Sequence, residues 1–174
     1  MSEPARGDIY HIEIADGEAM GHELKGGHWW VVLSITQLNA ALKLFTAVPL
    51  TSVLNSVDGK PKDRDDFRLF RIRIPEKYKT SDPGRVDKVF EGESIALVEQ
   101  TRVFSCLRIK GKRCGRVTDT ALAGIEAGLL FLIGAGIHRQ QADHPTAAAR
   151  PAKSVVPAEP PKPLPGKPLN LKGK

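Results

Sequence analysis

Apolar and polar residues alternate in short segments along the first 120 residues, in the two-residue period of half-buried β-strands. This pattern predicts strands over Asp8–Ile14, Trp29–Ile35, Lys43–Leu50, Phe67–Ile74, Ser94–Gln100 and Arg113–Val117. The segment Trp29–Ile35 is almost entirely apolar, which is typical of a strand buried on both faces. In Phe67–Ile74 the apolar side chains share one face, so we expect Arg71 and Arg73 to lie on a solvated face of the sheet.

A helical period follows the last predicted strand. Thr118 is a suitable N-cap and Asp119 suits the positive end of the helix dipole. The apolar stripe of this helix consists of Leu122, Ile125, Leu129, Leu132 and Ile133, and Gly134 and Gly136 end it. A short helical turn is also predicted at Thr36–Leu42. Many strands followed by one terminal helix predict a mainly β (α+β) fold, a small closed barrel capped by a helix.

The C-terminal segment has a different composition. Eight of the 13 prolines fall between Pro145 and Pro168, among Ala, Lys and Gly. Proline removes backbone donors, and few large apolar groups remain to offset the entropy of ordering. We therefore predict a barrel domain over residues 1–138 and a disordered, basic, proline-rich tail over 139–174. The sequence PPKPLPGKP also fits a polyproline II ligand.

The charge distribution restricts the function of the domain. The net charge is +6, and residues 140–174 hold six basic and two acidic side chains, so +4 belongs to the tail and +2 to the rest. The domain is therefore not a uniformly basic nucleic-acid binder, although a local basic groove is compatible with it. No run of about 18 apolar residues predicts a membrane span, and no secretory signal is visible. Cys106 and Cys114 are expected to be reduced thiols, which favours the cytoplasm.

Four polar clusters stand at predicted strand ends, where scaffolds present functional groups. They are Asp16–His28, which contains His22, Glu23 and His28, then Thr51–Ser52, Glu99–Arg102 and Arg108–Arg113. Each cluster also has a structural interpretation: a hydrogen-bonded histidine, a turn, a solvated strand end with an ion pair, and a charged hairpin turn. Cys106 and Cys114 lie in no zinc-like spacing.

The order of these segments resembles the PemK/MazF family of toxin endoribonucleases from bacterial toxin–antitoxin pairs. The opening RGDIYHIEI is similar to the first strand of that family, and GHELKGGHWWVVLS to its glycine-led loop and second strand. VPLTS is similar to its (Val/Ala)-Pro-(Ile/Leu)-Thr-Ser element. ALVEQTRVFS resembles its strand ending in Asp-Gln-x-Arg, and GKRCGRVTDTALAGIEAGLLFLIG the start of its terminal helix. The resemblance covers about residues 6–136.

This resemblance implies an SH3-like barrel, of a type shared with gyrase-poisoning toxins, that cleaves single-stranded, mRNA-like RNA without a metal or cofactor. It implies a homodimer held inactive by a small acidic antitoxin protein, with no role for a membrane. In such a reaction the 2′-hydroxyl attacks the adjacent phosphate, which requires a base, an acid and donors to the charged phosphorane.

Carried over by position, the resemblance assigns catalytic roles to His22, His28, Thr51 and Glu99, and substrate binding to Ser52, Gln100 and Arg102. Two departures stand out. Glu99 replaces the usual aspartate, and His28 and Trp29 replace an Arg-Pro pair whose arginine is a main catalytic candidate. Histidine lacks the permanent charge and bidentate fork of arginine. The segment 55–90 is also longer than in short family members.

Two alternatives remain open at this point. One is a catalytically weakened barrel that binds RNA or a protein without cutting it. The other is a gyrase-directed toxin, which VPLTS and the EQTR strand end favour less than they favour the ribonuclease. The sequence does not predict the RNA sequence that is cleaved, the identity of the antitoxin or a role for the tail.

Overall fold

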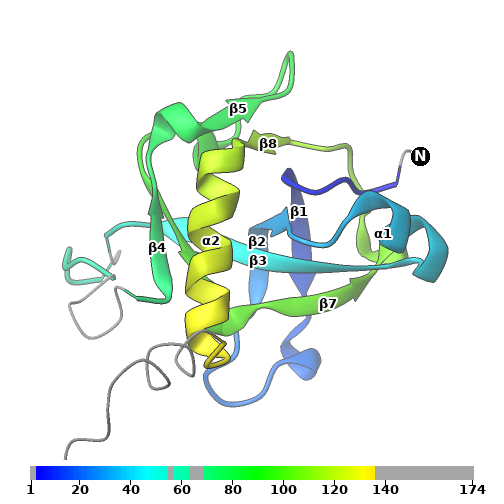
Figure 1. Ribbon diagram of the computed structural model, residues 1–174. Coiled ribbons are helices and arrows are strands. Elements are labelled where there is room, and N and C mark those ends of the chain that lie inside the picture. Colours follow the sequence, from blue (N-terminus) through cyan, green and yellow to red (C-terminus); the bar gives the residue numbers. More distant parts are fainter. Residues whose placement is uncertain (1–2, 55–56, 63–68, 136–174) are drawn as a thin grey trace, which may run out of the picture. The chain divides into compact units, whose positions relative to one another are not determined.

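The computed structural model describes residues 3–54, 57–62 and 69–135. The strands are β1 (Asp8–Ile14), β2 (Gly26–Val32), β3 (Leu44–Ser52), β4 (Arg71–Ile74), β5 (Lys79–Ser81), β6 (Ser94–Leu97), β7 (Arg102–Ser105) and β8 (Gly115–Val117) (Figure 1). The α-helices are α1 (Thr36–Leu42) and α2 (Asp119–Leu132), and single 3-10 turns include η4 (Lys88–Phe90) and η5 (Val98–Gln100).

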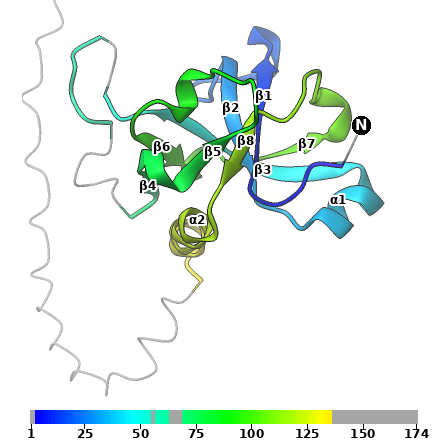
Figure 2. The same cartoon turned by 90° about the horizontal axis from the view of Figure 1, so that it is seen from above.

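The strands form one antiparallel, nearly closed barrel sheet in the order β4-β6-β3-β2-β1-β8-β5. The central strand β3 pairs with three neighbours, because its first half also pairs with β7. Figure 2 shows α2 end-on, outside the curved sheet. The predicted barrel with a terminal helix is therefore confirmed.

Two apolar clusters hold the sheet together, one on each face. Ile9, Val31, Val48 and Leu50 belong to the cluster that α2 covers through Ile125. The other cluster contains Tyr10, Ile12, Ile14, Ala19, Trp30, Val32, Phe45, Ala47 and Phe104. The ring of Trp30 meets that of Phe104 edge-on at a centroid distance of 4.7 Å. Burial of both faces explains the apolar run of β2.

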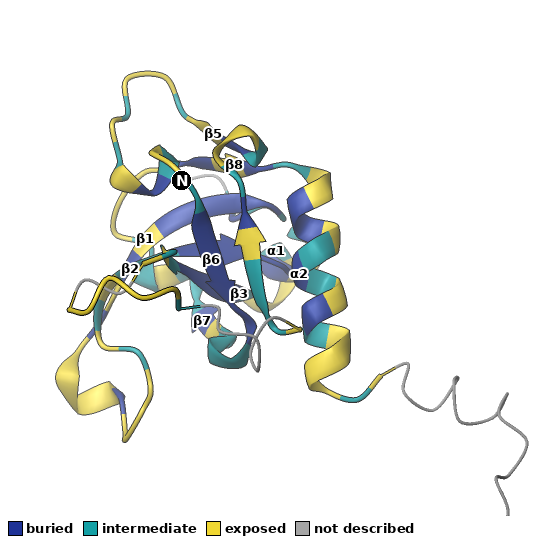
Figure 3. Cartoon of the chain, turned by 90° about the vertical axis from the view of Figure 1, so that its left-hand side faces the viewer, coloured by how far each residue is buried: buried dark blue, intermediate teal, exposed yellow. Residues whose placement is uncertain are grey.

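Helix α2 begins and packs as the sequence predicts, but its stripe is shorter. The Thr118 hydroxyl accepts from the Ala121 N–H at 3.4 Å, which confirms the N-cap. The buried face points toward the sheet (Figure 3), and a Cβ placed on Gly128 would lie 3.0 Å from the Ile72 side chain. The helix therefore lies very close to β4, whereas Leu132 and Ile133 near its end are 42% and 66% exposed.

Several predicted strand bounds differ from the structure. Strand β2 begins three residues earlier and ends at Val32, because the chain turns at Leu33–Ile35 into the predicted helical turn, α1. Strand β6 ends at Leu97, since residues 98–100 form η5 instead. Strands β5 and β7 were not predicted; they are three and four residues long, too short for a clear alternation.

The predicted tail lies outside the described residues, as does the predicted boundary at 138/139. The chain divides into two units, Met1–Asp143 and His144–Lys174. Within the ranges that the structure describes, no helix is both long enough and apolar enough to cross a membrane. Cys106 and Cys114 are both free thiols, as predicted.

Gly115 offers a stability test of the barrel closure between β8 and β5. A Cβ on Gly115 would lie 2.1 Å from the Thr80 carbonyl oxygen and 2.5 Å from the Phe90 ring. Because the nearest obstacle is backbone, Gly115→Ala should lower the free energy of unfolding by about 1–3 kcal/mol in urea titrations. Gly111→Ala is the control, since nothing lies within 4 Å of its Cβ position; equal stabilities of the two variants would contradict this packing.

Candidate functional site

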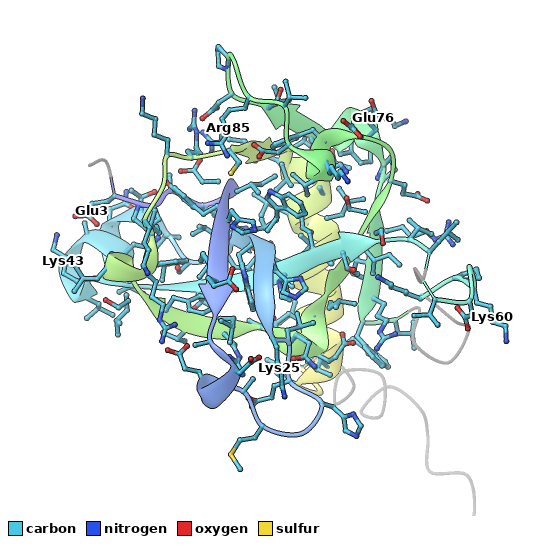
Figure 4. The ribbon with its side chains drawn as sticks, turned by 180° about the vertical axis from the view of Figure 1, so that it is seen from behind. Glu3, Lys25, Lys43, Lys60, Glu76 and Arg85 are labelled. Carbon is cyan, nitrogen blue, oxygen red and sulfur yellow. The ribbon has the colours of Figure 1, made fainter. Side chains whose placement is uncertain are left out.

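The predicted site residues form two groups that meet at η5, the turn that follows β6. Glu99 of this turn belongs to one group and Gln100 to the other. The first group contains Thr51, Ser52 and Glu99, and the second contains Gln100, Arg102 and the loop between β1 and β2 that carries His22. His28 lies not in this loop but directly after it, as the third residue of β2. Figure 4 marks the loops concerned by Lys60, which follows β3, and Lys25, which precedes β2.

Thr51 and Ser52 end strand β3, and both hydroxyls meet one lysine. The Lys62 ammonium donates to Thr51 Oγ1 at 2.7 Å and lies 3.3 Å from Ser52 Oγ. Ser52 Oγ in turn donates to the Leu54 carbonyl at 2.9 Å. Partial burial, and to a lesser degree the positive charge of Arg71, lower the pKa of Lys62. The hydroxyl pair is therefore fixed beside a partly desolvated cation.

Glu99 joins the same group through Arg71 of β4. Arg71 Nε donates to Glu99 Oε1 at 2.8 Å, and the two side chains are 25% and 20% exposed. Arg71 Nη1 also donates to the Lys62 carbonyl at 2.6 Å. The prediction that Arg71 lies on a solvated face is therefore wrong, because η5 returns the chain over this face and brings Glu99 onto it. Arg73 does lie exposed, and it pairs with Glu93 at 3.0 Å.

The two carboxylate oxygens of Glu99 differ in their surroundings. Oε1 is paired with Arg71, whereas Oε2 is buried and has no hydrogen-bond partner among the described residues. A buried acceptor without a partner costs free energy, so such an atom is expected to meet a ligand or a substrate proton. This geometry is suitable for a general base that Arg71 orients.

The second group holds the loop between β1 and β2 against the barrel. The Gln100 amide accepts from the Leu24 N–H at 3.3 Å and donates to the His22 carbonyl at 3.4 Å. Arg102 pairs with Glu23, and the N–H of Met20 and the Arg102 guanidinium lower the pKa of that carboxyl. Gln100 and Arg102 are thus placed to position the loop.

The two histidines differ in how far they are fixed. His28 Nε2 lies 2.9 Å from the Lys25 carbonyl. Because a carbonyl only accepts, Nε2 carries a proton and Nδ1 remains the atom that exchanges one. The His22 side chain is exposed and, within the described part of the chain, makes no hydrogen bond to another predicted site residue. The structure thus joins His22 to the site through its backbone only.

The fourth polar cluster, Arg108–Arg113, does not join these groups. It lines a groove of about 750 Å³ beside Tyr10 and His11, where Figure 4 labels Arg85. Arg108 pairs with Glu18, and Arg113 pairs with Asp82 at 2.8 Å. Within residues 3–54, 57–62 and 69–135, no three His, Cys, Asp or Glu side chains gather in a way that could hold a metal ion.

Sequence reasoning missed the two cations that connect the site. Lys62 comes from a polar loop with no periodicity, and nothing in the sequence distinguishes Lys62 from Lys60 as a functional residue. Arg71 was visible in the strand RIRI, but alternation assigns a face without saying which loop covers that face.

The comparisons with known proteins agree with this architecture. The chain matches the family described as "PemK-like, MazF-like toxin of type II toxin-antitoxin system" over residues 5–133. Since this match spans well over half of the 174 residues, the chain belongs to this family of toxins. A comparison with curated proteins found no match.

The chain is similar to several solved structures at low sequence identity. MazF from Deinococcus radiodurans is 19% identical with a TM-score of 0.50, and the alignment covers 76% of this chain and 97% of that one. An endoribonuclease from a mycobacterial species is 16% identical, with a TM-score of 0.47 and coverages of 77% and 94%. The Mycobacterium tuberculosis toxin MazF-mt6 is 10% identical, with a TM-score of 0.46 and coverages of 73% and 96%. At such identity the first of these likenesses shows the barrel fold alone.

The loop contacts generate a prediction about local stability. Gln100→Ala removes two side-chain hydrogen bonds to the loop, each with a net contribution of about 1 kcal/mol. Trypsin cleavage after Lys25 should therefore become at least about fivefold faster, with little change in melting temperature, because the loop opens without global unfolding. Val103→Ala is the control, since this side chain is 63% exposed on the neighbouring strand. Equal cleavage rates in the two variants would show that Gln100 does not hold the loop.

Proposed function

We propose that this toxin is an endoribonuclease that cleaves single-stranded RNA by attack of a 2′-hydroxyl on the adjacent phosphate. The observation that carries the proposal is the arrangement of Glu99, with one oxygen on Arg71 and the other buried without a partner among the described residues. Hydroxyls and a cation stand close by at the end of β3. A base beside phosphate-binding groups is what this reaction requires.

The residues suggest a role for each proton. Glu99 Oε2 accepts the proton of the 2′-hydroxyl while the 2′ oxygen bonds to phosphorus. Thr51 donates to a phosphorane oxygen, and Ser52 donates to another once its hydroxyl leaves the Leu54 carbonyl. The bond from phosphorus to the 5′ oxygen then breaks, and that oxygen takes a proton from Nδ1 of protonated His28. The products are a 2′,3′-cyclic phosphate and a 5′-hydroxyl. His22 is an alternative proton donor, because it lies on the loop that leads into β2 and His28.

Family membership supports the remaining parts of the proposal. The family consists of toxins of type II toxin–antitoxin systems, so we propose a small acidic antitoxin protein as the natural inhibitor. We further propose that the protein acts as a homodimer in the cytoplasm, where mRNA is its substrate. Gln100 and Arg102 bind substrate indirectly in this scheme, by positioning the loop that carries His22 and leads into His28 of β2.

Cleavage in the presence of EDTA tests this mechanism. The purified protein should cut RNA in EDTA as fast as without it, and the new ends should be 5′-hydroxyls with cyclic or 3′-phosphate partners. End mapping with and without phosphatase and kinase treatment distinguishes these ends. Ends with 5′-phosphates, or activity that EDTA abolishes, would exclude the 2′-hydroxyl mechanism. A failure to cleave any RNA would favour a barrel that only binds RNA or protein.

His28 variants test the assigned proton donor. If Nδ1 protonates the leaving oxygen, His28→Ala should slow cleavage by about 10²-fold or more, and the wild-type rate should fall as the pH is raised. If His28 acts only as a cation, His28→Arg should cleave faster than the wild type instead. An unchanged rate and pH profile in His28→Ala would remove His28 from the site and transfer the role to His22.

A further inference from the structure

The proposed reaction places an additional negative charge on a phosphate, and the residues assigned so far supply no permanent cation that is free to meet it. His28 gives up its charge together with the proton that it transfers, and the hydroxyls carry none. The guanidinium of Arg71 is already engaged by Glu99 at 2.8 Å. A group with a permanent charge stabilises such a transition state more than a neutral donor does.

Lys62 is held in place although it lies in a loop. Its N–H donates to the Val53 carbonyl at 2.9 Å, and Leu54 and Pro61 form a β-bridge immediately before it. Its own carbonyl accepts from Arg71 at 2.6 Å. The Val53 carbonyl and the Arg71 side chain thus fix the backbone of Lys62, and the contacts with Thr51 and Ser52 hold its side chain. The ammonium group is therefore already ordered before the reaction.

Among the described residues, the ammonium group of Lys62 has partners for only two of its three N–H bonds. An ammonium group has three N–H bonds and no acceptor, and Lys62 has two hydroxyl partners, on Thr51 and Ser52. No carboxylate pairs with it in the described part of the chain. Partial burial lowers the pKa of Lys62 and the nearby Arg71 charge adds to this effect. An anion placed beside the ammonium group would offset both the desolvation of this group and its repulsion by Arg71.

The same contact prepares Thr51 as a donor. Because Thr51 Oγ1 accepts from Lys62, its own hydroxyl proton must point toward a different acceptor. Among the described residues the hydroxyl has no such acceptor, whereas Ser52 donates to the Leu54 carbonyl. The Thr51 proton is therefore available to a phosphate oxygen, and the adjacent positive charge makes this hydroxyl a stronger donor.

We propose that Lys62 is a catalytic residue of this site, which binds the scissile phosphate with its third N–H and orients the Thr51 hydroxyl toward the same phosphate. The inference rests on the proposed ribonuclease function and adds to it the residue that supplies the charge. The ligand chemistry is that of an RNA phosphodiester, whose charge increases in the transition state. Lys62 therefore acts mainly on the rate of cleavage and only weakly on RNA binding.

Four variants separate charge, hydrogen bonding and location. Lys62→Met removes both charge and donors, Lys62→Gln keeps an amide donor for Thr51 without charge, and Lys62→Arg keeps the charge. Lys60→Met is the matched control, because Lys60 is an exposed lysine of the same loop. Single-turnover cleavage of a mapped RNA substrate gives the rate, and binding of the same RNA with a 2′-deoxy nucleotide at the cleaved position gives the affinity.

We expect Lys62→Met and Lys62→Gln to slow cleavage by about 10²-fold or more, which is a typical loss for one transition-state donor. Their affinity for the deoxy analogue should change less than about threefold, as should both quantities in Lys60→Met. Lys62→Arg should recover a large part of the rate. Thr51→Val should be nearly without further effect in a Lys62→Met background, since the two residues act as one unit.

Each other outcome overturns the proposal. A Lys62→Met rate equal to that of Lys60→Met removes Lys62 from catalysis, and a wild-type rate in Lys62→Gln reduces it to a positioning residue. A loss confined to affinity makes it a binding residue only. Melting curves accompany each variant, and if Lys62→Met unfolds, Lys62→Gln and Lys62→Arg decide the question. A wild type that does not cut RNA refutes the proposed function itself, whereas an active wild type with an active Lys62→Met refutes this inference alone.

Discussion

Strand β3 pairs with β2 along one edge and with both β7 and β6 along the other. Both the barrel and the site depend on how β7 and β6 divide that second edge. Leu44–Ala47 pairs with β7, whereas Leu50–Ser52 pairs with β6. Between these segments lies Pro49, which has no N–H to donate to a neighbouring strand. A proline is compatible with this central strand because the pairing is interrupted there on the edge that β6 and β7 share, although Pro49 stays opposite Trp30 of β2 on the other edge.

The chain turns away from β3 at this interruption, and the turn carries two of the candidate site residues. Residues 98–100 turn as η5 before β7 resumes the pairing with β3. As a result Glu99 and Gln100, adjacent in sequence, serve different parts of the molecule. Glu99 reaches Arg71, and Gln100 reaches the loop between β1 and β2. The interruption of the sheet thus supplies both the candidate base and the support for the loop that carries His22 and leads into His28 of β2.

The polar contacts of Arg71, Glu99 and Lys62 are stronger because these side chains are partly buried. Fully exposed ion pairs contribute little, because water screens them and the long side chains lose entropy. Arg71 and Glu99 are only about a quarter exposed, so the field between them is screened less. Lys62 shares this environment, as its lowered pKa indicates. A substrate phosphate that entered the site would meet charges that are already in position, which is the arrangement that favours catalysis.

The sequence by itself determined most of the elements, and it identified the candidate site residues. Alternation predicted β1 with its bounds, and the N-cap at Thr118 predicted α2, because these signals are local and each follows from a few neighbouring side chains. Motif order further pointed to the family and to the VPLTS and EQTR segments. The short strands β5 and β7 were missed, since three or four residues have no distinct period.

Only the tertiary structure decided which polar groups act together. Lys62 and Arg71 come from a loop and a strand whose sequences give no hint of Thr51 or Glu99. Their meeting depends on strand register and on the turn η5, both of which are set by long-range packing. Sequence periodicity assigns a residue to a face of its own element, but it does not determine which distant segment will cover that face. For this reason the sequence predicted the strand ends as functional, and the fold alone placed a lysine between them.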